Sequence, residues 1–275
     1  MAVKLAIIGG GRMGGALLRG LISSGWASPS ELVVVEINEA QRQRLEAGHR
    51  GLTTVSRLST RACEDAVLAV KPQDAEEACL AAGVAGVQRL LSVAAGITTS
   101  DLEKWMGTRA LVVRAMPNLP ALVAHCAAGM APGSRASERD LAWAAGVLGS
   151  VGTAVEVPEK LMDAVTGLSG SGPAYFFLVV EALIEAGVRA GLDRETSTTL
   201  VRHTFAGAAR LLTETGESAE DLRIAVTSPG GTTAAGIAAL EDRQVREAFV
   251  AAVEAATARS IELGTPGAKA TLTHR

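Results

Sequence analysis

The sequence VKLAIIGGGRMGG at residues 3–15 decides the fold of this chain. Its first six residues form a short apolar run that ends in glycine, as expected of a buried parallel strand. Gly9, Gly11 and Gly14 match the spacing G-x-G-x-x-G, and a helical pattern continues over residues 16–24. In this setting the glycines permit a tight turn, the close approach of a pyrophosphate and the packing of helix on strand. The stretch therefore predicts the start of a Rossmann-type dinucleotide-binding domain.

Glu36 follows a second apolar run at residues 32–35. It lies about 20 residues beyond the glycines, where an acid binds the adenosine ribose in such folds. A glycine-rich turn alone is a weak signal, but strand, glycines, helix, strand and acid together favour a dinucleotide site. A carboxylate here repels a 2′-phosphate, so it favours NADH over NADPH. Arg42 and Arg44 could weaken that preference, unless they are only surface charges of a helix.

Strand-like and helix-like segments alternate over residues 1–158, which predicts an α/β fold with a doubly wound sheet. Further strands are expected near residues 52–55, 66–70, 89–93, 110–114, 127–131 and 151–157, and further helices near 39–47 and 137–148. Ligands of such sheets bind beyond the carboxyl ends of the strands. Lys71, the small residues 94–96 and the rigid loop 116–120 follow such ends. A lysine there is more often merely solvated, whereas small residues would let a flat nicotinamide ring lie close.

From residue 159 onward, Ala- and Leu-rich helical patterns replace the strands and predict an all-α domain over residues 159–264. The motif LSGSGP at residues 168–173 predicts a cap and a proline at the first position of a helix that runs to residue 190. Asp193 is expected to cap a second long helix that runs to residue 215. Three more helices are expected: one at 219–226, a short one that ends at 241 and a last one at 243–263. The first helix is apolar on nearly every side, so its own domain or another subunit must cover it. We therefore expect a dimerisation domain, followed by a loose tail at residues 265–275.

A tight turn that leads into a helix is predicted where residues 226–241 read VTSPGGTTAAGIAALE. The proline fixes one backbone angle and the two glycines permit conformations closed to other residues. The amides of residues 231–233 would then be unpaired donors ringed by hydroxyls, which can bind an anion without a cationic side chain. The alternative is an ordinary helix start capped by Ser228 or Thr232. A carboxylate pocket in a chain with a nucleotide site indicates a reductase.

Composition places the chain among ordinary globular proteins. The net charge is −3, so the chain has no excess of basic residues to attract phosphate backbones. Aromatic residues make up only 3%, so few side chains can stack on bases. We therefore expect no nucleic-acid partner. Cys63, Cys79 and Cys126 fit no metal or CxxC pattern and resemble small buried residues in a reducing compartment. With no signal peptide and no long apolar segment, we expect a cytoplasmic protein without a membrane span or a metal site.

Side chains near these loops form no Ser-His-Asp set and no carboxylate pair, which fits hydride transfer because the cofactor then carries the reactive chemistry. Reduction of a ketone would need a strong acid, and only Lys71 and Tyr175 lie near suggestive motifs. An imine is readily protonated by water and needs only a hydroxyl for its nitrogen and amides for its carboxylate. The turn at residues 228–233 offers both.

Two blocks, VTGLSGSGPAY at residues 165–175 and VTSPGGTT at 226–233, resemble the signature blocks of the pyrroline-5-carboxylate reductase family. The likeness extends to the opening glycines, to AVKPQ at 69–73 and to VRAMPN at 113–118, and leaves out only the tail. The two C-terminal blocks are long and specific, whereas many dehydrogenases share the N-terminal fingerprint.

The resemblance implies reduction of L-1-pyrroline-5-carboxylate to L-proline by NADPH or NADH, the last step of proline biosynthesis. Catalytic Thr233 would hydrogen-bond the ring nitrogen. Ser228 and the amides of Gly231 and Thr232 would receive the carboxylate, and Glu159 would line the proline site. The expected substrate-binding residues are Glu159, Ser228, Gly230, Gly231, Thr232 and Thr233, and the expected cofactor-binding residues are Gly9, Gly11, Arg12, Met13, Gly14, Glu36, Ala69, Val70, Lys71, Pro72, Ala95 and Asn118.

The resemblance also implies an interlocked homodimer with shared active sites, and in some members a pentamer of dimers. Two positions depart from the family pattern. Leu119 replaces the usual Thr of a Met-Pro-Asn-Thr-Pro loop, and GES at residues 216–218 stands where a proline is common.

Three alternative functions share this fold or part of these motifs. A β-hydroxyacid dehydrogenase would carry a catalytic lysine on the interdomain helix, and residues 173–185 contain none. A non-catalytic nucleotide-binding regulator would not need the intact turn at 228–233. A reductase of a related cyclic imine acid is harder to separate, because one methylene changes binding by only about 1–3 kcal/mol.

Overall fold

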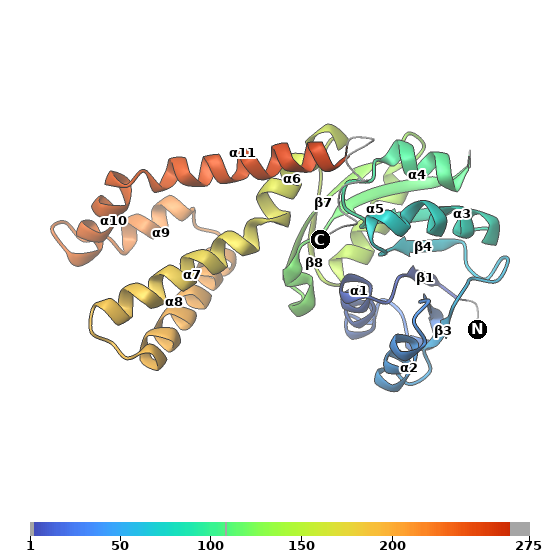
Figure 1. Cartoon of the computed structure of the whole chain (residues 1–275), viewed down its shortest axis with the longest axis horizontal. Helices are drawn as coiled ribbons and strands as arrows, with labels where there is room; N and C mark the ends of the chain where they lie inside the picture. The colour runs from blue at the N-terminus through green and yellow to red at the C-terminus, as the bar shows by residue number, and fades with distance from the viewer. Residues whose placement is uncertain (1–2, 108, 265–275) are drawn as a thin grey trace. The chain divides into compact units, whose positions relative to one another are not determined.

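An eight-stranded sheet dominates the N-terminal half of the chain in the computed structural model, which describes residues 3–107 and 109–264 (Figure 1). The strands are β1 (Leu5–Ile8), β2 (Leu32–Val35), β3 (Thr53–Val55), β4 (Asp65–Leu68), β5 (Arg89–Ser92), β6 (Leu111–Met116), β7 (Cys126–Pro132) and β8 (Gly152–Glu156). Their order is β3-β2-β1-β4-β5-β6-β7-β8. The predicted α/β fold with a Rossmann-type sheet is confirmed.

Only β7 runs antiparallel to a neighbour, β6, among the strand pairs of the described residues. The connection between these two strands spans residues 117–125, including the short helix η3 (Leu119–Val123). A crossover between parallel strands needs a dozen or more residues. The short loop therefore forces the reversal, which the alternation of segments did not predict.

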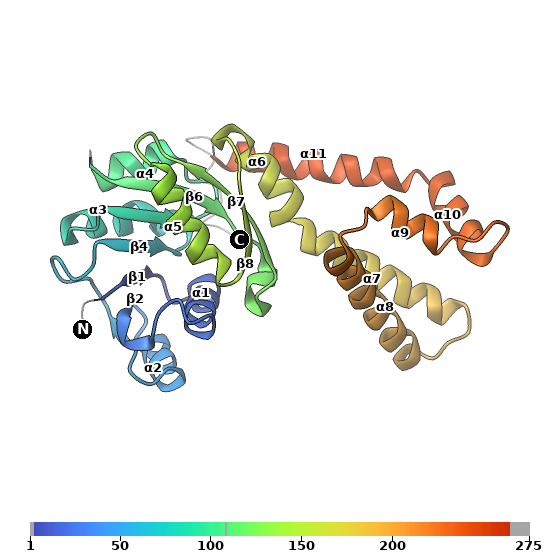
Figure 2. The same cartoon turned by 180° about the vertical axis from the view of Figure 1, so that it is seen from behind.

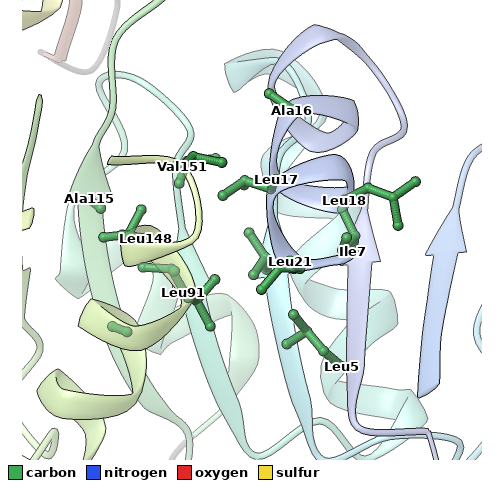
Figure 3. Packing of buried hydrophobic residues seen from close by; sticks show 14 of the residues in the cluster. Leu5, Ile7, Ala16, Leu17, Leu18, Leu21, Leu91, Ala115, Leu148 and Val151 are labelled. Atoms are coloured by element: carbon green, nitrogen blue, oxygen red, sulfur yellow. The ribbon is translucent and has the colours of Figure 1, made fainter. Parts of the chain in front are cut away.

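Helices cover both faces of the sheet (Figure 2). They are α1 (Arg12–Ser23), α2 (Glu39–Gly48), α3 (Ala75–Ala85), α4 (Thr99–Met106) and α5 (Glu138–Gly149). Leu5 and Ile7 of β1 face a core shared with α1 and α5, whereas Ala6 and Ile8 face a core shared with α3 and α4. Figure 3 shows the leucines of α1 packed over β1 in the first of these cores.

The α-helices after residue 171 are α7 (Gly172–Arg189), α8 (Arg194–Thr215), α9 (Ala219–Ala225), α10 (Thr232–Asp242) and α11 (Val245–Gly264). The chain divides into two compact units: the described residues up to 171 together with 254–264, and residues 172–253. Within 172–253, only Gly172 and Ser197 are buried, so the second unit has no apolar core of its own among the described residues. The predicted boundary after residue 158 stays a prediction, and the predicted loose tail at 265–275 lies outside the described residues.

The predicted start of α7 is wrong in one respect. The motif at residues 168–173 does not cap a new helix, because α6 (Met162–Val165) and a π-helical turn (Thr166–Gly170) lead almost directly into α7. The hydroxyl of Ser169 donates to the carbonyl oxygen of Val165 rather than capping α7. The N–H of Ser171 donates to Thr166, five residues back, at 2.8 Å. A widened turn of this kind accommodates Pro173, which has no N–H to continue a regular helix.

We predict that the three cysteines react slowly with thiol reagents in the folded protein. All three are buried; burial raises the pKa of the Cys79 thiol to about 12 and also raises the pKa of Cys63 and Cys126. Because these values lie above the pH of the solution, the reactive thiolate is scarce at about pH 8. A chromogenic disulfide assay should show slow release in buffer and fast release in denaturant. Fast reaction of the folded protein would contradict this burial.

Candidate active site

The glycine-rich turn after β1 leaves no room for side chains at two motif positions. Gly9 has a φ of +104°, and a Cβ there would lie 2.7 Å from the carbonyl oxygen of Ala69, which follows β4. A Cβ at Gly14 would lie 1.9 Å from the carbonyl oxygen of Gly9. The first glycine is therefore needed for the turn and the third for the packing of α1 on β1, as the motif predicts.

Gly11, the middle glycine, faces open space. It has a φ of −71°, and no heavy atom lies within 4 Å of its Cβ position apart from its own chain neighbours and helix. No side chain caps α1, whose first turn contains the exposed Arg12 and the half-buried Met13 but no acid. An uncapped helix start beside an open glycine suits an anion. These residues therefore fit the pyrophosphate of a dinucleotide.

Glu36 lies next to this turn at the carboxyl end of β2. Its carboxylate accepts hydrogen bonds from the backbone N–H groups of Gly10 and Asn38, each at 2.9 Å. Arg42 donates to the backbone carbonyls of Glu36 and Ile37, at 2.8 and 3.0 Å. A carboxylate oxygen has more than one lone pair, so Glu36 can still accept a further donor. The acid and Arg42 are thus both held at the edge where the ribose is expected.

The other predicted cofactor residues follow β4 and β5. Ala69 and Val70 are half-buried, and Lys71 is exposed just before the short helix η2 (Pro72–Asp74). Ala95 is exposed beyond the end of β5. In the sheet order, β4 and β2 flank β1 on opposite sides, so the strand order changes direction here. Such a switch point is where open α/β sheets bind their ligands.

Asn118 has a buried side chain that is hydrogen-bonded to protein at both ends. Its Oδ1 accepts from the N–H of Ala127 at 3.1 Å, and its Nδ2 donates to the carbonyl oxygen of Ser169 at 3.0 Å. Leu119, which departs from the family pattern, is 46% exposed and takes no part in these two hydrogen bonds. These contacts give Asn118 a structural role, and its predicted contact with the cofactor stays a prediction.

Glu159 is half-buried and forms a polar cluster with the buried Thr99 and Arg114, which the sequence did not reveal. Its carboxylate accepts from the N–H of Thr99 at 2.7 Å and from the Thr99 hydroxyl, and the Arg114 guanidinium lies 3.4 Å away. The Arg114 side chain on β6 is only 7% exposed, and a buried charge is costly unless it is paired. Glu159 therefore ties the start of the helical segment to α4. No sequence pattern joins these residues, which lie 45 and 60 positions from Glu159.

Residues 228–233 form the predicted turn at the start of α10. The N–H of Gly231 donates to the carbonyl oxygen of Ser228 at 3.0 Å, and Gly230 has a φ of +72°. A type II turn favours proline at its second residue and needs a positive φ at its third, which glycine adopts easily. Gly231 is the N-cap of α10 and makes no side-chain cap hydrogen bond, and the first turn has no acid. The alternative of a start capped by Ser228 or Thr232 is therefore wrong.

Two hydroxyl groups flank this uncapped start. A Cβ at Gly231 would lie 2.4 Å from the Oγ of Ser228, so the serine hydroxyl lies directly beside the turn. Thr232 is exposed and Thr233 is half-buried. Helix-start amides with nearby hydroxyls and no acid can bind a carboxylate.

Comparisons with known proteins identify the family. Residues 159–263 match the family model described as pyrroline-5-carboxylate reductase dimerisation, and residues 4–96 match NADP oxidoreductase, coenzyme F420-dependent. A curated pyrroline-5-carboxylate reductase of Methanosarcina acetivorans is 43% identical over 267 residues, covering 95% of this chain and 98% of the relative. The chain belongs to the pyrroline-5-carboxylate reductase family. It is therefore an oxidoreductase.

Solved structures agree with this assignment. A pyrroline-5-carboxylate reductase from Coxiella burnetii matches with a TM-score of 0.89 and 34% identity, covering 96% of this chain and all of that one. The Plasmodium falciparum pyrroline carboxylate reductase, solved with NADP bound, matches with a TM-score of 0.79 and 30% identity, covering 96% of this chain and 98% of that one.

The predicted nucleotide residues of the reductase thus share one unit, and most of them lie at the carboxyl edge of the sheet. The turn at 228–233 belongs to the other unit, residues 172–253. Sequence reasoning missed Thr99, Arg114 and the contact of Asn118 with Ser169. A polar residue buried in an apolar strand, such as Arg114, is the signal that could have found the first two.

We predict that Gly11→Ala weakens nucleotide binding about tenfold or more, because the new methyl group would occupy the space that fits a pyrophosphate. The free energy of unfolding should change by no more than about 1 kcal/mol, because that space is open and φ is ordinary. Dissociation constants from fluorescence titration and denaturant melts measure both quantities. Gly48→Ala, also in open space at the end of α2, is the matched control. Unchanged affinity in Gly11→Ala would exclude the proposed pyrophosphate position.

Proposed function

We propose that this chain reduces L-1-pyrroline-5-carboxylate to L-proline with a nicotinamide cofactor. The observation that carries the proposal is the uncapped, acid-free helix start at residues 228–233 in a member of this family that also has an open dinucleotide-binding turn. One unit supplies the cofactor site and the other supplies the substrate turn. The predicted domain limits, 1–158 and 159–264, are part of the proposal.

The substrate is held by this chain's own groups. The amides of Gly231 and Thr232 and the hydroxyl of Ser228 bind its carboxylate, and the Thr233 hydroxyl orients the ring nitrogen. Water protonates the imine, so no buried acid is required. The bound nicotinamide cofactor supplies the hydride to the C=N carbon. The positive end of the α10 dipole lies at the carboxylate and stabilises that charge without a cationic side chain.

NADH is the preferred cofactor in this proposal, and NADPH is the second. Glu36 supports this order because its carboxylate is fixed at the expected ribose site by Gly10 and Asn38. The Plasmodium relative was solved with NADP, and Arg42 beside Glu36 is a cation that could bind a 2′-phosphate.

A homodimer is the proposed state, and a pentamer of dimers is the larger assembly to test. Support comes from the dimerisation model over residues 159–263 and from the missing apolar core of the second unit. One helical stretch of the described residues, Glu159–Arg189, is long and apolar enough to cross a membrane by length and composition alone, which is weak evidence. We assign its apolar surface to the dimer and propose a cytoplasmic location, in line with three buried free thiols.

The test is oxidation of NADH and of NADPH by the purified protein with pyrroline-5-carboxylate, followed by loss of reduced-nicotinamide absorbance. Rapid oxidation that yields proline supports the proposal. No oxidation by a protein that binds nucleotide would contradict it and favour a related cyclic imine acid or a regulatory role.

Thr233→Ala should lower kcat/KM for the imino acid about 10- to 100-fold, because the ring nitrogen loses its hydroxyl partner. The dissociation constant for the nucleotide should not change, because Thr233 lies outside the unit that contains the nucleotide residues. Steady-state kinetics and fluorescence titration measure the two effects. Thr153→Ala, at an exposed position on β8, is the control. If Thr233→Ala turned over at the wild-type rate, the Thr233 hydroxyl would have no role in the mechanism.

Glu36→Ala should reduce the preference for NADH over NADPH several-fold, since the repulsion of a 2′-phosphate is lost. Glu36→Gln separates charge from structure, because it removes the charge and keeps an acceptor for the neighbouring amides. The ratio of kcat/KM for the two cofactors is the measurement. An unchanged ratio in both variants would mean that Glu36 does not reach the ribose.

A further inference from the structure

The segment that joins the two units is held by polar contacts at three points. We call residues 159–171 the connecting segment. Glu159 at its start is bound by Thr99 and Arg114. In its middle, the Asp163 carboxylate accepts a hydrogen bond of 2.6 Å from the Ser260 hydroxyl of α11. Near its end, the carbonyl oxygen of Ser169 accepts from Asn118.

The third contact occurs where the backbone itself lacks a donor. In a regular helix the carbonyl oxygen of Ser169 would accept from the N–H four residues later, which is the position of Pro173. Proline has no N–H, so this bond cannot form. The Asn118 amide at 3.0 Å takes the place of that donor. The same amide accepts from Ala127 on β7, so it connects the sheet to the last turn before α7.

We propose that Asn118 is a positioning residue for the reaction. Its hydrogen bond to Ser169 fixes the π-helical turn at residues 166–170, and α7 begins directly after this turn. Because α7 begins at this turn and belongs to the unit that carries residues 228–233, we expect loss of the bond to loosen the chain between the two groups of site residues and to slow the reaction, whichever subunit of the proposed homodimer supplies each group. This inference rests on the proposed function, and it replaces direct contact with the cofactor as the reason for an asparagine at this position.

The charge of the side chain provides the first test. In Asn118→Asp the ionised carboxylate can still accept from Ala127 but cannot donate to Ser169. We expect kcat/KM for the imino acid to fall about tenfold or more relative to wild type at about pH 8. When the carboxyl group of the variant is protonated, it gains one O–H donor that can bond to Ser169. The ratio of kcat/KM in the variant to kcat/KM in the wild type should therefore rise again toward about pH 5. Gln88→Glu makes the same chemical change at an exposed position before β5 and should show no such recovery.

The missing backbone donor provides the second test. Pro173→Ala restores an N–H that can bond to Ser169 without Asn118. Asn118→Ala should therefore lower kcat/KM about tenfold in the wild-type background but only about twofold in the Pro173→Ala background. A merely structural role for Asn118 would not produce rescue at this one position.

Two readouts do not depend on turnover. Hydrogen exchange at the Ser171 amide, which donates to Thr166, should become faster in Asn118→Ala and return toward the wild-type rate with Pro173→Ala. The dissociation constant for NADPH should be unchanged. If the wild-type protein fails to reduce pyrroline-5-carboxylate, these readouts still test the bond, so the two proposals can fail separately. Two results would overturn the positioning role. One is weaker NADPH binding in Asn118→Ala with an unchanged exchange rate at the Ser171 amide. The other is an equal loss of kcat/KM on Asn118→Ala in the wild-type and Pro173→Ala backgrounds.

Discussion

Pro173 cannot donate a hydrogen bond, and the local conformation of residues 166–173 follows from that constraint. The carbonyl oxygen of Ser169 is left without its usual helical donor, and the Asn118 side chain supplies one from the end of β6. The backbone here forms a π-helical turn at residues 166–170, which is wider than a turn of α-helix. Glu159 and Asp163 fix the same segment through Thr99 and Ser260. The segment at residues 159–171, which leads into α7, is thus hydrogen-bonded at several points within the first unit.

This anchoring matters because the two units carry different parts of one chemistry. The first has two apolar cores, one on each face of the sheet, which hold the glycine-rich turn rigidly. The second has no apolar core among its described residues, yet it carries the helix start that suits a carboxylate. A unit of this kind depends on a second copy for burial, in agreement with the dimerisation model that covers it.

Much of the fold could be read from local sequence. Short strand-like runs predict all eight strands, and the Asp193 cap is confirmed by its hydrogen bond to the Thr196 amide. The turn at 228–233 was predictable because Pro229 fixes its own φ and Gly230 permits the positive φ that the turn needs. What the sequence could not reveal are pairings between distant residues. Asn118 and Ser169 lie 51 positions apart, and Thr99 and Glu159 lie 60 apart. The α3 and α4 helices were missed because α3 is rich in alanine with little polar alternation and α4 has only 8 residues.

The central claim is that the start of α10 binds the carboxylate of the imino acid and that the carboxyl edge of the sheet binds the cofactor. The most direct measurement is a crystal structure of the protein with oxidised cofactor and L-proline. The account predicts the proline carboxylate within hydrogen-bonding distance of the amides of Gly231 and Thr232, and the proline ring against the nicotinamide. A proline carboxylate bound by other residues, with the turn at 228–233 empty, would contradict it.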